Sequence, residues 1–145
     1  MNELKGENGQ PSGKQTRPNW LTALCILTFI GSGMSNISFL MIYFSYEEAL
    51  PLMKEFGSIV PGMELFASAG RNFFLTGFIL YFLSLVGASL MWQLRKIGFH
   101  FYTASQIMLV LLPVVYIKGF PFPLLEASIT AIFILFYSRF LKLMS

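Results

Sequence analysis

The feature that most constrains this chain is an uncharged stretch of 27 residues, Trp20 to Tyr46. About 20 apolar residues cross the hydrocarbon core of a bilayer as an α-helix, so this stretch is long enough to span a membrane. Small and polar residues recur along one helix face of the stretch, at the spacing i, i+3, i+4 and i+7: Cys25, Thr28, Gly31, Ser32, Ser35 and Asn36. Small side chains let membrane helices approach closely, and hydroxyl and amide groups bond across the contact. We therefore predict that this face packs against other helices.

Three further apolar stretches follow the first one. The four predicted spans cover about residues 20–45, 72–94, 97–117 and 124–143. Hydrophobic residues make up 55% of the 145 residues and charged residues 12%, which is about half of the usual charged share. A bilayer accepts this many apolar side chains, whereas a water-soluble chain of this length could not bury them. We predict an all-α, integral membrane four-helix bundle in which residues 19–145 form one domain.

The chain begins with a polar segment, residues 1–18, that has no hydrophobic period. Such a segment cannot bury enough apolar surface to order itself, so we predict a flexible tail. The first apolar stretch is longer than the h-region of a signal peptide, which is about 7–15 residues, and no small-residue cleavage site follows it directly. We expect this stretch to remain in the protein as the first span.

Basic residues close to the spans predict the orientation of the chain. With a cytoplasmic N-terminus, seven basic residues lie on the cytoplasmic side: Lys5, Lys14, Arg17, Arg95, Lys96, Arg139 and Lys142. Three lie outside: Lys54, Arg71 and Lys118. The glutamates have the opposite distribution. We predict that both termini of this multi-pass protein, including the tail, are cytoplasmic.

The connection between the first and second spans, residues 47–70, mixes apolar and charged residues. We predict a short amphipathic segment on the extracytoplasmic surface of the membrane, broken by Pro51, Gly57, Pro61 and Gly62. Pro61 is expected to open a helix, because proline suits the first helical position. In one interpretation this helix continues without a break into the second span.

Two amides lie within the spans, Asn36 in the first and Gln106 in the third. In one interpretation each bonds across a pair of helices, and in the other they line a polar cavity. His100 lies one turn from Lys96 and is expected at the membrane interface. Cys25 is the only cysteine and, with no base beside it, is expected to act as a small hydrophobic residue.

Five glutamates lie on the predicted outer side: Glu47, Glu48, Glu55, Glu64 and Glu126. We expect solvated loop charges, with a divalent cation or a basic partner as the alternative. Arg71 is expected to pair with Glu64 on a continuous helix, or with Glu126. The sequence has no nucleophile with a base, no phosphate-binding loop and no zinc spacing, so we predict no catalytic residues, no metal site and no cofactor. The tail is too sparsely basic for nucleic acid.

The opening of the first span resembles that of a group of small bacterial membrane proteins. The similar segment runs from Arg17 to Gly33 and reads RPNWLTALCILTFIGSG. Members of this group have a similar size and about four spans, and they have no assigned activity. The resemblance implies a protein of the bacterial inner membrane.

These observations favour a non-enzymatic protein that acts as an interaction module or as a small subunit of a membrane assembly. Apart from the lipid bilayer, its expected partner is another membrane protein or a second copy of the chain. The alternative is a small oligomeric channel or transporter for a small solute or a lipid, using Asn36, Gln106 and a kink at Pro113. A third hypothesis is an enzyme at the outer interface that uses Glu64, Arg71 and Glu126. Ion-coupled transport is disfavoured, because no span has an Asp, Glu, Lys or Arg residue at its centre.

Overall fold

The computed structural model describes residues 17–144, and residues 1–16, which make up most of the predicted tail, lie outside this range. The described residues contain helices and no strand, which confirms the all-α prediction. The elements are α2 (Asn19–Phe44), α3 (Tyr46–Gly57), α4 (Met63–Ser68), α5 (Arg71–Trp92), α6 (Lys96–Tyr116), α7 (Leu124–Arg139) and the 3-10 helix η1 (Leu141–Leu143).

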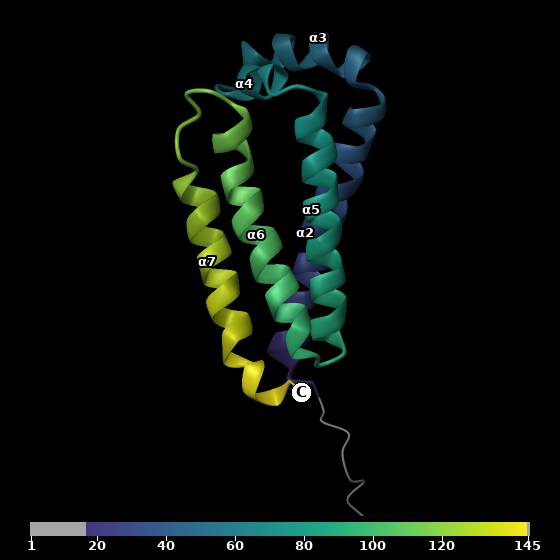
Figure 1. Cartoon of the computed structure of the whole chain (residues 1–145), viewed down its shortest axis with the longest axis vertical. Helices are drawn as coiled ribbons and strands as arrows, with labels where there is room; N and C mark the ends of the chain where they lie inside the picture. Colours follow the sequence, from purple (N-terminus) through teal and green to yellow (C-terminus); the bar gives the residue numbers. More distant parts are fainter. Residues whose placement is uncertain (1–16, 145) are drawn as a thin grey trace, which may run out of the picture.

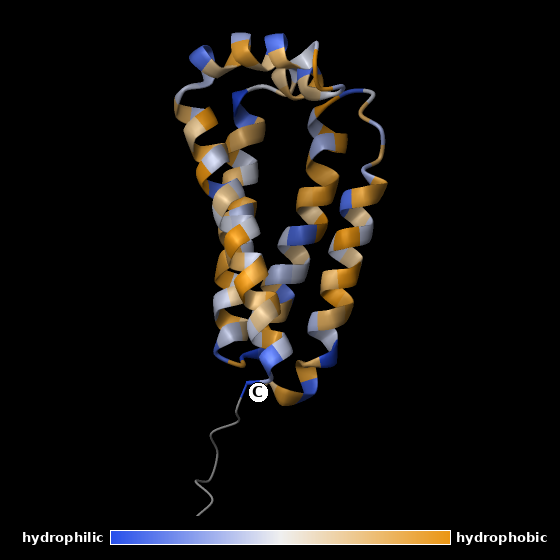
Figure 2. Cartoon of the chain, turned by 180° about the vertical axis from the view of Figure 1, so that it is seen from behind, coloured by the Kyte–Doolittle hydropathy of each residue, from blue (hydrophilic) through white to orange (hydrophobic). Residues whose placement is uncertain are grey.

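Four of these helices are long and apolar enough to cross a membrane, and they run side by side (Figure 1). They begin and end within a few residues of the predicted spans, and the fourth includes η1. Apolar residues predominate along the four helices, and hydrophilic residues lie toward their ends and at a few places in the middle of the bundle (Figure 2). The chain is a multi-pass membrane protein with a four-helix arrangement.

The closest packing in the bundle joins α5 and α6. A Cβ atom added to Gly87 would lie 2.6 Å from the backbone nitrogen of Tyr102, and one added to Gly98 would lie 2.5 Å from the carbonyl oxygen of Gly87. The two backbones therefore touch, and only glycine leaves room for this contact. A tight turn at Leu94, whose φ is 61°, returns the chain from α5 into α6.

Helix α2 packs on α5 through the small faces of both helices. Gly77, Ser84 and Ala88 of α5 are buried, and a Cβ atom at Gly77 would overlap the ring of Phe39 in α2. The Phe39 ring in turn lies against Phe73, Phe74 and Tyr81 of α5. The result is a compact unit of α2, α5 and α6.

Helix α7 lies at the edge of this unit, next to α6 (Figure 1). Only 6% of the most apolar part of the fourth span is buried, compared with 39% for α5. The single buried side chain of α7 is Tyr137. Most of the α7 surface is therefore left to lipid or to a partner.

The connection between α2 and α5 forms two short helices across one end of the bundle (Figure 1). Helix α3 is amphipathic, as predicted: it buries Met53 and exposes four charged residues, Glu47, Glu48, Lys54 and Glu55. The prediction that Pro51 breaks this segment is wrong, because Pro51 lies inside α3. Proline removes one backbone hydrogen bond, and at this exposed position the freed carbonyl group can reach water or lipid headgroups.

Two expectations for the second half of this connection are also corrected. Helix α4 begins at Met63 and not at Pro61, because Gly62 takes a left-handed conformation with φ 93°. Helix α4 does not continue into the second span, because Gly70, with φ 86° and ψ 166°, separates it from α5. A residue with this φ cannot extend a right-handed helix.

Candidate functional site

Three polar side chains meet in the middle of the bundle, one from each of α2, α5 and α6. Ser84 is fully buried, and its hydroxyl oxygen accepts a hydrogen bond from the Gln106 amide at 3.0 Å. The Ser32 hydroxyl lies 3.3 Å from the same oxygen. Hydrocarbon offers no other partner at this depth, so these bonds hold the three helices together. Gln106 thus has a partner on a neighbouring helix.

Asn36 also bonds across a helix pair, at a separate place. Its amide nitrogen donates to the carbonyl oxygen of Phe78 in α5 at 2.8 Å. Asn36 and Gln106 were predicted either to bond between helices or to line a polar cavity. The structure gives each amide its own partner, and other residues line the two hollows described below.

A further polar contact fixes α7 to α2. The hydroxyl groups of Tyr137 and Thr28 lie 2.8 Å apart, and both side chains are buried. The Tyr137 ring packs edge-on against Tyr102 of α6, with ring centroids 4.9 Å apart. Cys25 is fully buried in the same cluster, and its Sγ atom lies 3.9 Å from the carbonyl oxygen of Ala88. Cys25 therefore packs as a small side chain, and Tyr137 is the main anchor of α7.

Of the six residues predicted for the packing face of the first span, one faces away from the bundle. Cys25, Thr28 and Ser32 are buried, and Ser35 and Asn36 are half-buried. Gly31 is exposed, and a Cβ atom placed on it would have no heavy atom within 4 Å. It lies at the edge of the polar stripe, on a side of α2 that no other helix of residues 17–144 covers. The prediction that Gly31 packs against another helix of the same chain is therefore wrong. A contact of Gly31 with a second molecule stays a prediction.

The small residues near the start of the fourth span also point largely outward. Ser128 and Ala131 are exposed and Ala127 is half-buried. Leu124 and Leu135 lie one turn beyond these residues on the same side, and both are exposed. A small-residue face of this kind allows close approach of another helix, and within residues 17–144 Ser128 and Ala131 are left uncovered.

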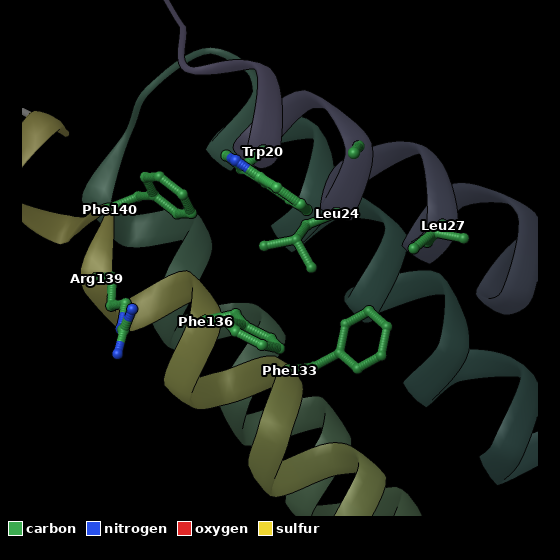
Figure 3. Close-up of a pocket in the computed structure, with 8 residues that line it drawn as sticks. Trp20, Leu24, Leu27, Phe133, Phe136, Arg139 and Phe140 are labelled. Atoms are coloured by element: carbon green, nitrogen blue, oxygen red, sulfur yellow. The ribbon is translucent and has the colours of Figure 1, made fainter.

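An apolar groove of about 570 Å³ lies between α2 and α7 (Figure 3). Helix α2 contributes Trp20, Ala23, Leu24 and Leu27. The other wall consists of Phe133, Phe136, Arg139 and Phe140. Trp20 and Leu24 face the two aromatic rings of α7, and Arg139 lies at the end of α7 near Phe140 (Figure 3). Arg139 is the only charged residue of the lining.

The groove opens at the end of the bundle where basic residues collect. The α5–α6 turn carries Arg95 and Lys96, and η1 carries Lys142. Arg17 lies over the ring of Trp92, with its guanidinium carbon 3.9 Å from the ring centroid, and donates to the Trp92 carbonyl oxygen. Within residues 17–144 every glutamate lies toward the opposite end, in α3, in α4 or in the first turn of α7. The bundle is thus basic at one end and acidic at the other.

The predicted ion pair between Arg71 and Glu64 is wrong, because Gly70 puts the two residues on separate helices. Arg71 instead donates to the carbonyl oxygen of Tyr43 at 2.9 Å and lies over the Tyr43 ring. It therefore joins the end of α2 to the start of α5.

The outer glutamates are exposed, as expected for solvated charges. Glu126 lines a second, shallower hollow of about 320 Å³ with Val60, Pro61 and Phe120, and Glu64 is not part of this hollow. No group of three or more His, Cys, Asp or Glu residues in the described part of the chain could hold a metal ion. His100 is exposed near the start of α6, as the interfacial interpretation requires.

Three structural determinants were missed by sequence reasoning: the contact of Gly87 with Gly98, the Tyr137 anchor, and the groove that ends at Arg139. The contact of the two glycines could have been found from the sequence, since they lie on either side of a tight turn in an antiparallel helix pair.

Comparison with protein-family models, with curated proteins and with solved structures finds no match. The resemblance of the first span to small bacterial membrane proteins therefore stays a prediction.

Proposed function

We propose that this chain is a non-enzymatic interaction module of the bacterial inner membrane. In this proposal it binds a helix of another membrane protein, or of a second copy, and acts as a small subunit of the assembly. The observation that carries the proposal is the uncovered state of its small-residue surfaces. Gly31 of α2 and the pair Ser128 and Ala131 of α7 are exposed, whereas the comparable small faces of α5 are buried within the bundle.

The physical reason lies in what drives helix association in a bilayer. Lipid tails are as apolar as leucine, so a large apolar side chain gains little by leaving lipid for a protein contact. Small residues differ, because they let two backbones come close and gain dispersion contacts along the helices. Within this chain, Gly87 and Gly98 show such a contact. The exposed small residues are suited to the same kind of contact with a second molecule.

The proposed orientation has both termini in the cytoplasm. The first residues of α2, the α5–α6 turn and the end of α7 share one end of the bundle (Figure 1). Five basic residues belong to this end: Arg17, Arg95, Lys96, Arg139 and Lys142. An excess of Lys and Arg in short loops is typical of the cytoplasmic side, which supports the assignment.

The channel or transporter hypothesis depends on polar groups that face a path. Gln106 and Asn36 are the main candidates, and both are bonded to other helices of the same bundle. The enzyme hypothesis needs Glu64, Arg71 and Glu126 around one cleft, and Arg71 is instead held at Tyr43. We therefore favour binding over transport or catalysis.

The test uses two glycines of the same helix as a matched pair. Gly31 and Gly33 both have no heavy atom within 4 Å of an added Cβ atom, so a side chain at either position starts in open space. Two residues along a helix are turned by about 200°, so the two leucines point to nearly opposite sides. The tagged protein and both variants are purified in mild detergent, and the associated proteins and the molecular mass are determined.

We expect the wild type and Gly33→Leu to retain the same partner or oligomeric state, and Gly31→Leu to lose it. A mass equal to a multiple of the chain identifies self-association, and a different co-purified protein identifies a subunit. A wild type that is monomeric and free of any partner would contradict the proposal. Equal effects of the two leucines would contradict the role of the Gly31 side.

A further inference from the structure

We infer that the groove between α2 and α7 is a binding site for one anionic phospholipid. One acyl chain lies between the walls of the groove, and the phosphate is held by Arg139. This inference does not depend on the proposed partner, because the groove is formed within a single chain.

The shape of the groove suits an acyl chain. Its volume of about 570 Å³ falls in the usual range for small-molecule sites, about 300–1,000 Å³. Trp20 and Leu27 are seven residues apart, so the α2 wall extends about 10 Å into the membrane. A 10 Å length of helix, about 10 Å across with its side chains, fills on the order of 800 Å³. An extended hydrocarbon chain therefore fits the space, and a partner helix does not.

The chemistry of the lining follows the polarity of a phospholipid. Leu27 and Phe133 lie at the deeper end, and Trp20, Arg139 and Phe140 lie at the other end (Figure 3). Tryptophan is enriched at the headgroup level of membranes, and Trp20 is 78% exposed beside the groove. A guanidinium group binds phosphate through two parallel hydrogen bonds. The apolar walls thus face the acyl region, and the cation is at the level of the phosphate.

Charge complementarity selects an anionic lipid over a neutral one. Arg139 is the only charged residue of the groove, and Arg95, Lys96 and Lys142 belong to the same end of the bundle. No glutamate of residues 17–144 lies at this end to offset them. Basic pockets between membrane helices on the cytoplasmic side bind anionic headgroups in this way.

The test uses Trp20, which lines the groove at its outer end, as a reporter. The chain has two tryptophans, and Trp92 is replaced by phenylalanine, which keeps a ring for Phe29 and Arg17 to pack on. The Trp92→Phe protein is placed in phosphatidylcholine vesicles. Phosphatidylglycerol or phosphatidylcholine with a brominated acyl chain is then added at equal mole fractions. Bromine quenches the Trp20 fluorescence on contact, so quenching gives the relative affinity of the two lipids.

We expect brominated phosphatidylglycerol to bind several-fold more tightly than brominated phosphatidylcholine. Arg139→Gln should reduce this preference about fivefold, which corresponds to the ~1 kcal/mol that a basic residue contributes at an anionic surface. Lys142→Gln removes the same charge from η1, outside the groove lining, and should leave most of the preference intact.

Equal quenching by the two lipids would overturn the inference, because the groove would then hold neutral lipid as readily. Equal losses in Arg139→Gln and Lys142→Gln would also overturn it, since the preference would come from general surface charge. No quenching by either lipid would overturn it as well, because no acyl chain would then lie against Trp20.

Discussion

Replacing Gly87 with alanine adds a methyl group where α5 and α6 touch. The new Cβ atom would lie 2.6 Å from the nitrogen and 3.0 Å from the Cα atom of Tyr102, and 2.8 Å from the carbonyl oxygen of Gly98. All three are backbone atoms, so no side chain can rotate away to make room. The helices must separate by about 0.8 Å to bring the closest contact to the ordinary minimum of 3.4 Å.

The expected cost follows from three terms. Overpacking costs about 1–3 kcal/mol, and we expect the upper end because backbone atoms are displaced. A rigid shift of about 0.8 Å would also stretch the 3.0 Å bond between Gln106 and Ser84 beyond hydrogen-bonding distance, which costs about 0.6 kcal/mol in a membrane helix pair. Alanine gains about 1 kcal/mol over glycine in a helix interior. The net free energy of unfolding should fall by about 2–3 kcal/mol.

The assay is equilibrium unfolding in mixed micelles with increasing dodecyl sulfate, followed by circular dichroism. Gly31→Ala is the control, because it makes the same chemical change in a spanning helix with no heavy atom within 4 Å. It should leave stability unchanged or raise it by up to about 1 kcal/mol. Gly98→Ala should resemble Gly87→Ala. If Gly87→Ala and Gly31→Ala unfold at the same denaturant fraction, the close contact between α5 and α6 is refuted.

Three other substitutions test the remaining contacts in the same unfolding assay. Tyr137→Phe removes the hydrogen bond to Thr28 and should lower the free energy of unfolding by about 0.6–1.7 kcal/mol. Tyr137→Ala also leaves a cavity and should lower it by about 3–5 kcal/mol. Equal costs of the two substitutions would show that the ring does not anchor α7. Gln106→Leu should cost about 0.6–1.7 kcal/mol in a Ser84 background and almost nothing after Ser84→Ala, and additive costs would exclude their bond. Gly70→Ala should cost about 1–3 kcal/mol, because alanine is strained at φ 86°, and a neutral result would favour a continuous helix from α4 into α5.

Much of the fold was predictable because the cues were local. Each span is an apolar stretch between charged or turn-forming residues, and its length alone shows that it can cross a bilayer. The amphipathic character of α3 was visible from charged residues that alternate with apolar ones. The small face with Ser32 in α2 was predicted from helical spacing, and Ser32 is buried. Hydroxyl and amide groups in hydrocarbon need hydrogen-bond partners. A bond from Gln106 to a polar side chain of a neighbouring helix could therefore be predicted, although not which side chain.

The breaks between helices were less predictable. Proline and glycine both mark interruptions in a sequence, but Pro51 lies within α3, whereas Gly70 ends one helix and precedes another. The difference depends on the backbone conformation and on whether the carbonyl group that proline leaves unbonded can find another partner. The residue type alone determines neither of these.

Which face of each span meets which neighbour was decided by tertiary structure. In water an apolar face is driven inward, so hydrophobic periodicity indicates the core. In a bilayer the outer face is equally apolar, and this cue is lost. The sequence by itself therefore determined four spanning helices and the small, polar face of the first. Only the packed structure placed Gly31 outward and Gly87 against Gly98, and only it left a groove between α2 and α7 with Arg139 at its end.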